Sequence, residues 1–276
     1  MSINKGRLKG SFHRQAGEYD RHTSVQKRVV DRLVSLVGEH VSGAPSKVLD
    51  IGCGTGRLLA LLNRQYPQAR QYGLDLAYNM IRHARERLGD DTVLLQGDAE
   101  QLPFRPESFD LAVSSSTLQW LDDLGPFFRQ CRLVVKDGGV LCIAFFGGRT
   151  LQELHECYRD AAVKLSGDSS GKITERLHRF RSIADVQKAV EQAGFDIVLL
   201  TSEIEMDYYC GVPELLRSIK RIGAGSAAQG SSAGGLGWRG VLNETSRLYQ
   251  QRYGTNGTIP VTYEVFYIVA RCSGRA

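Results

Sequence analysis

The sequence has no pair of cysteines spaced as C-x-x-C. Its six cysteines are scattered along the chain: Cys53, Cys131, Cys142, Cys157, Cys210 and Cys272. Zinc ribbons and thiol redox motifs place their cysteines in close pairs, so we expect neither a redox centre nor a metal site. Reduced thiols in a cytoplasmic protein are the interpretation that fits this pattern best.

Long apolar runs are also missing. No run approaches the roughly 18 residues that a membrane helix needs, and the basic residues 1–7 are not followed by the apolar core of a signal peptide. We therefore expect a soluble protein with no membrane partner. The formal net charge of +5 over 276 residues is modest. It permits an acidic partner but does not indicate nucleic-acid binding, so no nucleic-acid partner is expected.

Apolar segments and helical patterns alternate from residue 47 onward. A helical segment over residues 7–40 comes first. Strands are then predicted near 47–51, 70–75, 92–96, 109–115 and 139–146, with helices near 56–65, 77–88 and 123–134 between them. The turn before the fifth strand is expected at residues 136–139. This alternation predicts a parallel sheet with helices on both faces.

After residue 148 the alternation changes. The pattern predicts helices at 150–165 and 182–193 around a polar break at 166–171, a strand near 195–209, and a last strand near 259–271. Between those strands lie predicted helices at 213–222 and near 238–252, joined by small residues that we expect to be mobile. An insertion of this length predicts a lid or a binding loop.

The stretch DIGCGTG at residues 50–56 follows the first predicted strand and precedes a helix. Its glycines permit positive φ and a close approach of the backbone to a ligand, and the helix points free N–H groups at the turn. A dinucleotide turn has the spacing G-x-G-x-x-G, but Arg57 stands where that pattern requires glycine. Asp50 would repel a diphosphate and attract a cation. We therefore predict S-adenosylmethionine, a sulfonium with an amino-acid tail, over a nicotinamide dinucleotide or an empty turn.

Two more carboxylates follow predicted strands, at the edge of the sheet where open α/β folds bind ligands. Asp75 is placed to accept hydrogen bonds from both ribose hydroxyls; the alternative is that it only caps the next helix. Asp98 is placed to take the adenine amino group, with Ala99 against the ring, and a surface turn is the alternative there.

Two other segments are candidates for an acceptor site. The fourth strand ends in SSSTLQW at 114–120, where small hydroxyl residues leave space for a reacting methyl group and Gln119 and Trp120 are candidates for its wall. A tryptophan at such a position is more often a core residue. In the helix at 213–222, Arg217, Lys220 and Arg221 share the side opposite an apolar stripe. Such charges usually form a solvated face, but on a lid they would meet an acidic substrate or partner.

Four segments together resemble class I methyltransferases: DIGCGTG at 50–56, DLAYNM at 75–80, GDAEQLPF at 97–104 and SFDL at 108–111. This resemblance covers roughly residues 45–145. Further segments are similar to the malonyl-acyl-carrier-protein O-methyltransferases of biotin synthesis: Phe12 with Tyr19-Asp20 and Val25-Gln26, the pair Gln119-Trp120, LRSIKRIGA at 216–224 and PVTYEVF at 260–266. These segments span nearly the whole chain.

The resemblance implies a seven-stranded, mostly parallel Rossmann-like methyltransferase sheet with helices on both faces. It also implies an N-terminal helical cap at 1–44, a methyltransferase domain at 45–276 and a lid-like insertion at 210–257. The implied reaction transfers a methyl group from S-adenosylmethionine to the free carboxylate of a malonyl thioester, carried by acyl-carrier protein or by coenzyme A. That carboxylate is already ionised at pH 7 and needs no general base, so alignment and exclusion of water are the expected tasks.

The resemblance also implies roles for residues. The cofactor-binding set is Asp50, Gly52, Cys53, Gly54, Gly56, Asp75, Leu76, Asp98, Ala99 and Ser115. Tyr19 is expected close to the transferred methyl group, with Gln119 and Trp120 bordering the acceptor. One of Arg217, Lys220 and Arg221 is expected to bind the malonyl carboxylate, or the three dock the acidic carrier protein.

Two other functions are left open by the residues. A methyltransferase that acts on a quinone precursor or a small carboxylic acid would share the cofactor motifs, but would leave the basic helix without a partner. A non-catalytic regulator would bind S-adenosylmethionine without transferring its methyl group.

Overall fold

The computed structural model describes residues 5–21, 23–166, 180–222 and 236–274. Their strands are β1 Lys47–Ile51, β2 Arg70–Asp75, β3 Val93–Gln96, β4 Phe109–Ser115, β5 Val135–Phe146, β6 Phe195–Tyr209 and β7 Ile259–Cys272. Their helices are α1 Lys5–Tyr19, α2 Ser24–His40, α3 Arg57–Gln65, α4 Tyr78–Leu88, the 3₁₀ turn η1 Leu118–Trp120, α5 Leu124–Val134, α6 Gln152–Ser166, α7 Ile183–Gln192, α8 Val212–Arg221 and α9 Leu236–Tyr253.

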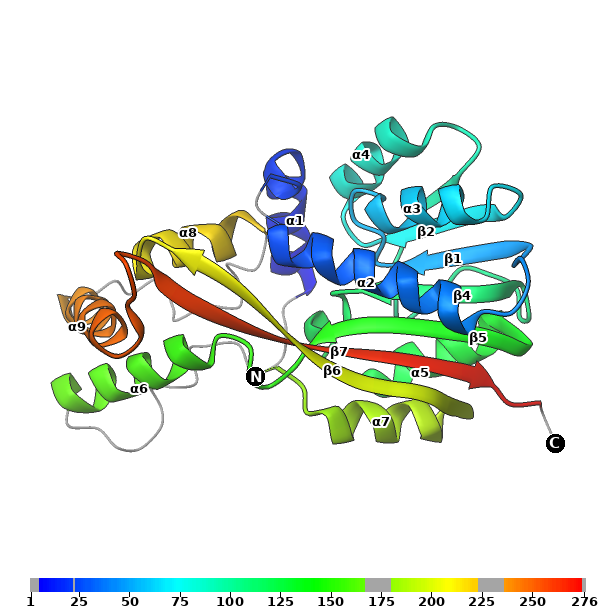
Figure 1. Ribbon diagram of the computed structural model, residues 1–276. Helices are drawn as coiled ribbons and strands as arrows, with labels where there is room; N and C mark the ends of the chain where they lie inside the picture. The colour runs from blue at the N-terminus through cyan, green and yellow to red at the C-terminus, as the bar shows by residue number, and fades with distance from the viewer. Residues whose placement is uncertain (1–4, 22, 167–179, 223–235, 275–276) are drawn as a thin grey trace.

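The strands form one sheet in the order β3-β2-β1-β4-β5-β7-β6, with helices on both faces (Figure 1). The first five strands pair in parallel, and β7 lies antiparallel between β5 and β6. The order of strands along the chain reverses between β1 and β4, which opens a crevice beyond their carboxyl ends. The predicted fold, a seven-stranded and mostly parallel sheet, is confirmed.

Most predicted elements lie within two residues of their predicted limits, but β5 does not. This strand begins at Val135, so the turn expected at residues 136–139 lies inside it. Val135 still pairs with Phe109, and the register then shifts before Leu111. Two residue steps along β4 lie opposite five along β5, so residues 136–139 form a multi-residue bulge, within which Gly138 adopts a φ of 74°. The run of small residues expected to be mobile and the polar break at 166–171 lie almost wholly outside the described residues.

Two apolar layers form the core, one on each face of the sheet. One layer joins α2 and α3 to β1, β5 and β7, and the other joins α5 and α7 to the opposite face. On α2 the stripe that contains Val29, Leu33 and Val37 is fully buried, as its helical spacing predicts.

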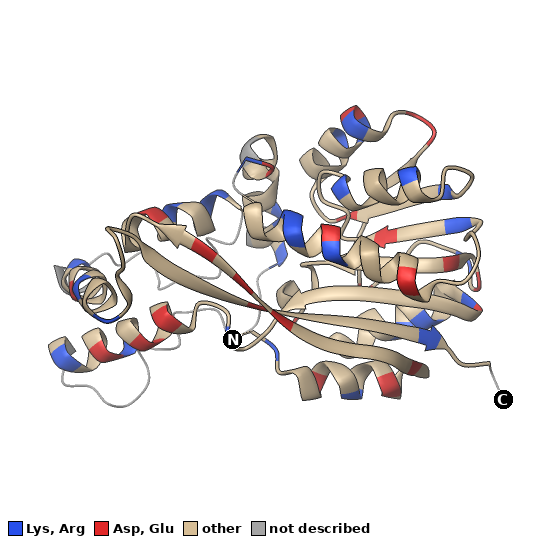
Figure 2. Cartoon of the chain, in the orientation of Figure 1, with Lys and Arg blue, Asp and Glu red and all other residues tan. Residues whose placement is uncertain are grey.

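A row of acidic residues on β6 forms ion pairs with the N-terminal half of α2. Alternation along the strand puts Glu203, Glu205 and Asp207 on one face of β6. The Arg28 guanidinium pairs with Glu205 at 2.5 Å, and Arg32 pairs with Glu203 at 2.8 Å. Figure 2 shows this row of acidic residues beside the basic residues of α2.

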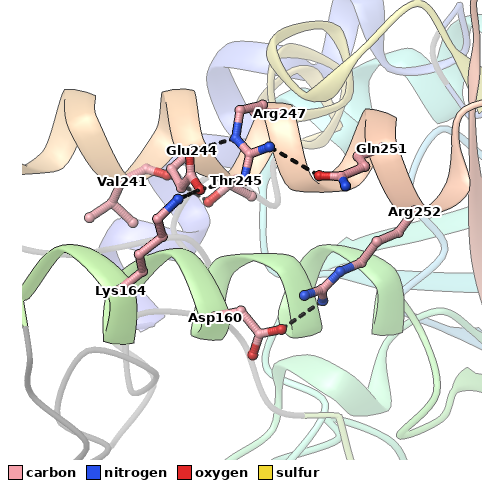
Figure 3. A network of polar contacts seen from close by, with 8 residues as sticks. All are labelled: Asp160, Lys164, Val241, Glu244, Thr245, Arg247, Gln251 and Arg252. Atoms are coloured by element: carbon pink, nitrogen blue, oxygen red, sulfur yellow. Dashed lines mark hydrogen bonds and ion pairs between the residues drawn. The ribbon is translucent and has the colours of Figure 1, made fainter.

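The helices α6 and α9 lie side by side near the C-terminal end of β6 and the start of β7 (Figure 1). Arg252 of α9 pairs with Asp160 of α6 at 2.6 Å, and Lys164 pairs with Glu244 at 2.8 Å (Figure 3). These ion pairs are largely exposed and each contributes little to stability. The buried Tyr249, whose hydroxyl donates to the Pro260 carbonyl at 2.9 Å, anchors α9 to the sheet.

Candidate cofactor and acceptor site

The glycine turn between β1 and α3 has a different need for glycine at each position. Gly52, Gly54 and Gly56 have φ values of 81°, 53° and 81°. A Cβ atom on Gly52 would collide with the Thr117 side chain, and one on Gly56 would lie 2.8 Å from Leu88 Cδ1. A Cβ atom on Gly54 would meet nothing within 4 Å. Two of the glycines therefore serve packing, and Gly54 faces open space.

That open space is a solvent-accessible cavity beyond the carboxyl ends of β1, β2 and β4, here called the main cavity. The predicted site residues that line it are Tyr19, Gly52, Gly54, Asp75, Leu76, Asp98, Ala99, Ser115 and Trp120. A second hollow beside it, the turn cavity, is lined by residues that include Asp50, Cys53 and Ser115. Of the predicted cofactor set, Gly56 alone lines neither of these two cavities, because it packs against Leu88.

Asp75, the last residue of β2, bonds to two backbone N–H groups. Its Oδ2 accepts from the Gly54 N–H at 3.0 Å, and its Oδ1 accepts from the Ala77 N–H at 2.8 Å. It therefore supports both the glycine turn and the start of α4 while it lines the main cavity. Burial raises the pKa of this carboxyl to about 6, and the two N–H groups act in the opposite direction.

Asp50 of β1 is a buried carboxylate with an incomplete set of partners. The residue is 1% exposed, and within the part of the chain that the structure describes its Oδ1 has no hydrogen-bond partner. Burial, followed by the charge of Asp75, raises its pKa well above the ordinary value. A buried carboxylate in this state favours a cationic guest, which would satisfy the oxygen and stabilise its ionised form.

Asp98 lies at the opposite end of the main cavity, where α1 begins. Its Oδ1 accepts from the Glu100 N–H at 3.0 Å, and its Oδ2 lies 2.7 Å from Lys5 Nζ. Lys5 also pairs with the Glu100 side chain. The carboxylate predicted for the adenine amino group is therefore bonded to the first turn of α1.

Tyr19 connects the cavities at the other end of α1. It lines the main cavity, the turn cavity and a third, largely apolar cavity, here called the apolar cavity. Burial, and then the charges of Asp75 and Asp20, raise the pKa of its hydroxyl well above the ordinary value. The phenol is therefore neutral at physiological pH and keeps its proton available for donation to a hydrogen bond.

The apolar cavity lies between α1, η1, α8 and the ends of β5 and β7. Its lining is Phe12, Tyr19, Gln26, Ser116, Gln119, Trp120, Phe146, Thr150, Leu151, Phe180, Ile219, Ile222 and Tyr263. The Trp120 ring meets Phe12 edge-on at a centroid distance of 5.7 Å. Gln119 Nε2 donates to the Ser116 carbonyl at 2.8 Å, which fixes the amide against the end of β4. Gln119 and Trp120, the two residues predicted to border an acceptor site, therefore both line the apolar cavity.

The predicted basic residues of α8 lie elsewhere. Ile219 and Ile222 face the apolar cavity, whereas Arg217, Lys220 and Arg221 are exposed and line none of the three cavities. Figure 2 shows basic residues along α8. Of the two roles that the sequence left open, this placement favours docking of a partner over binding of the malonyl carboxylate.

Sequence reasoning found Tyr19 and Phe12 but missed the other two residues of α1 that line the main cavity. Lys5 and Leu8 line the main cavity together with Phe12 and Tyr19. Their spacing of three, four and seven residues puts them on one face of a helix, and that periodicity was the signal available.

Across the described ranges, no helix is long and apolar enough to cross a membrane, and no group of three His, Cys, Asp or Glu side chains is placed to hold a metal ion.

The chain matches known proteins over nearly its whole length. A family model described as a methyltransferase domain matches residues 49–143. A malonyl-[acyl-carrier protein] O-methyltransferase of Geobacter sulfurreducens is 41% identical over 272 residues, which cover 98% of this chain and 99% of that protein. The chain belongs to the malonyl-[acyl-carrier protein] O-methyltransferase family. The predicted family is thereby confirmed.

Two other matches place this O-methyltransferase among its neighbours. A biotin biosynthesis bifunctional protein of Teredinibacter turnerae is 33% identical over 98% of this chain, which spans 47% of that longer protein. The crystal structure of a putative methyltransferase from Bacillus halodurans has a TM-score of 0.60 and 18% identity, over 89% of this chain and 99% of the other. At that identity the structure shows the shared fold alone.

Proposed function

We propose that this O-methyltransferase moves the methyl group of S-adenosylmethionine to the free carboxylate of a malonyl group held as a thioester on acyl-carrier protein. The observation that carries the proposal is the junction at Tyr19, where a cavity suited to a cationic cofactor meets an apolar acceptor cavity. The name of the Geobacter sulfurreducens relative supports the acceptor. The product is the methyl ester, and the reaction that forms it is an early step of biotin synthesis.

The residues of the main and turn cavities fit the parts of this cofactor. Asp50, with an unpartnered and buried Oδ1, would receive the ammonium group of the methionine portion, and Gly54 would let the backbone approach it. Asp75 would accept the ribose hydroxyls, and Asp98 with Ala99 would hold the adenine. The bound cofactor supplies an electrophilic methyl group on a sulfonium.

In the acceptor cavity, the chain has to align a carboxylate and keep water away from it. The described residues that line this cavity include no lysine, arginine or histidine, so neutral donors such as the Tyr19 hydroxyl would orient the carboxylate. A neutral donor leaves more negative charge on the attacking oxygen than a salt bridge would. Phe12, Trp120 and Ile219 would exclude water.

The carrier protein would dock outside the cavity. Arg217, Lys220 and Arg221 form a basic surface on α8, next to the residues of that helix that face the acceptor cavity. An acidic partner would be attracted to this surface, and its tethered malonyl group would enter beside α8. We assign residues 210–257 as a lid over the methyltransferase domain at 45–276, and residues 1–44 as its cap. The free cysteines agree with a cytoplasmic location.

The decisive experiment incubates the purified protein with S-adenosylmethionine and malonyl-acyl-carrier protein and measures the mass of the carrier. A gain of one methylene unit that disappears on ester hydrolysis is expected. Parallel reactions with malonyl-coenzyme A, free malonate and a quinone precursor define the acceptor class. Binding of the cofactor with no transfer to any acceptor would contradict the proposal and favour the non-catalytic regulator.

A further inference from the structure

The residue that follows α1 is bonded to the glycine turn. Asp20 Oδ1 accepts a hydrogen bond from Thr55 Oγ1 at 2.8 Å. Thr55 lies between Gly54 and Gly56 and is 5% exposed. The end of α1 is therefore connected to the turn that borders the main cavity, although 35 residues separate the two partners along the chain.

Arg87 of α4 joins both partners of this bond. One guanidinium nitrogen donates to the Thr55 carbonyl at 2.9 Å and to Thr55 Oγ1 at 3.0 Å. The other nitrogen pairs with Asp20 Oδ2. We call Asp20, Thr55 and Arg87 the turn clamp. A planar fork with two nitrogens holds two elements at a fixed separation, whereas a lysine would offer one point charge.

The clamp lies next to Tyr19, one of the two described residues that line all three cavities; the other is Ser116. Tyr19 precedes Asp20, and consecutive Cα atoms are about 3.8 Å apart, so a restraint on Asp20 restrains the Tyr19 backbone. Arg87 itself lines none of the three cavities. Its side chain is 34% exposed and that of Asp20 is 36% exposed, so the pair contributes little to stability. The ion pair between Arg87 and Asp20 instead restrains the position of the Tyr19 backbone relative to the glycine turn.

We propose that Arg87 is a positioning residue for methyl transfer, which holds Tyr19 in register with the glycine turn through Asp20 and Thr55. This inference rests on the proposed function. The reaction needs the acceptor oxygen, the methyl carbon and the sulfur in line, and displacement of a positioning group by about 1 Å costs up to about 100-fold in rate.

The test compares Arg87→Met with Arg82→Met, a change of an exposed arginine on the same helix that lines none of the three cavities. We expect Arg87→Met to lower kcat by about ten- to 100-fold at saturating cofactor and acceptor, with a smaller change in the dissociation constant of S-adenosylhomocysteine. Arg87→Lys should restore part of the rate. Adding Asp20→Asn to Arg87→Met should cost little more, because the two residues act together.

Hydrogen exchange supplies a readout that does not depend on activity. Backbone amides of residues 5–19 should exchange faster in cofactor-free Arg87→Met than in wild type or Arg82→Met. An unchanged kcat, or equal losses in Arg87→Met and Arg82→Met, would overturn the inference. If the wild type transfers no methyl group, the proposed function fails while the exchange measurement still tests the clamp. If Arg87→Met does not fold, Arg87→Lys and Asp20→Asn are compared with wild type by the same measurements.

Discussion

Lys5 Nζ lies 2.7 Å from Asp98 Oδ2, so the first residue of α1 is bonded to the loop that follows β3. At its other end, α1 is followed by Asp20, which is bonded to Thr55 of the glycine turn. The helix thus lies along the main cavity with a polar connection at each end. The two connections have different neighbours, so their loss should have different effects.

Loss of the Lys5 connection should weaken cofactor binding. Lys5→Met removes the partner of Asp98 Oδ2 and loosens α1 at the end of the cavity proposed to hold the adenine. We expect the dissociation constant of S-adenosylhomocysteine to rise by roughly three- to tenfold, as for a partly exposed pair, with kcat at saturation little changed. Calorimetry measures the affinity, and Lys9→Met on the exposed side of α1 is the control. Equal affinities of the two variants would refute the assignment.

Asp75 should contribute more to cofactor affinity than Lys5. Asp75→Ala removes the acceptor of the ribose hydroxyls and the support of the Gly54 N–H. The expected loss is roughly 1–3 kcal/mol of binding free energy, the cost of leaving such groups unpaired. Titration calorimetry with S-adenosylhomocysteine checks it, with the exposed Asp90→Ala as control. An unchanged affinity would argue against this site for the ribose.

Cofactor affinity should also fall in acid. The pKa of Asp75 is about 6, and the ribose hydroxyls proposed to bind there would donate to its ionised form. The contribution of Asp75 to the affinity is therefore constant well above pH 6 and declines below it, at most tenfold per pH unit. The raised pKa also means that Asp75 favours folding most below about pH 3.8 and loses that contribution as the pH rises through about 6. Calorimetry from pH 5 to 8 should show a shallower decline for Asp75→Asn than for wild type.

The Tyr19 hydroxyl should matter for turnover and not for acid–base chemistry. Tyr19→Phe removes one neutral donor from the junction of the cavities, so kcat/KM for malonyl-acyl-carrier protein should fall by up to about tenfold. The rate should show no ionisation of a tyrosine below pH 9, because the pKa of this phenol is raised. Tyr78→Phe, at a residue that is 56% exposed, should be neutral. A full rate in Tyr19→Phe would exclude the donor role.

The basic surface of α8 should act on the carrier and not on the chemistry. Replacing Arg217, Lys220 and Arg221 with serine should raise KM for malonyl-acyl-carrier protein several-fold and make it less sensitive to salt. Turnover of malonyl-coenzyme A should change much less. Arg64→Ser on α3 controls for charge alone. If both acceptors lose turnover equally, one of these bases binds the malonyl carboxylate instead.

The sequence predicted the elements with strong periodicity and short turns. The limits of β1, β2 and β4 agree with the predicted ranges because apolar runs there end at glycine or polar residues. The start of β5 was missed because a glycine pair is typical of a turn, and a bulge is distinguished from a turn only by the neighbouring strand. The positions of Asp75 and Asp98 were predicted from the rule that ligands bind at the carboxyl ends of strands, whereas the full set of cofactor residues came from the family resemblance.

The rest of the site depends on contacts between distant residues. Lys5 and Asp98 are separated by 93 positions, and no local pattern in either segment indicates that they pair. From the sequence, Arg87 is indistinguishable from other surface residues of α4, and it comes close to Thr55 and Asp20 only in the folded chain. The roles assigned to individual residues stay predictions.

The place of β7 in the sheet constrains the order in which the chain is assembled. Of the strands that the structure describes, β6 pairs only with β7, although it is synthesised about fifty residues earlier. During translation β6 therefore has no edge to join until the ribosome has made the last strand. The ion pairs of Arg28 and Arg32 with β6 also form only after β7 has been synthesised and β6 has joined the sheet. A chain that terminates before residue 259 would leave the edge of β5 and the acidic row of β6 exposed, which makes it a substrate for chaperones and proteases.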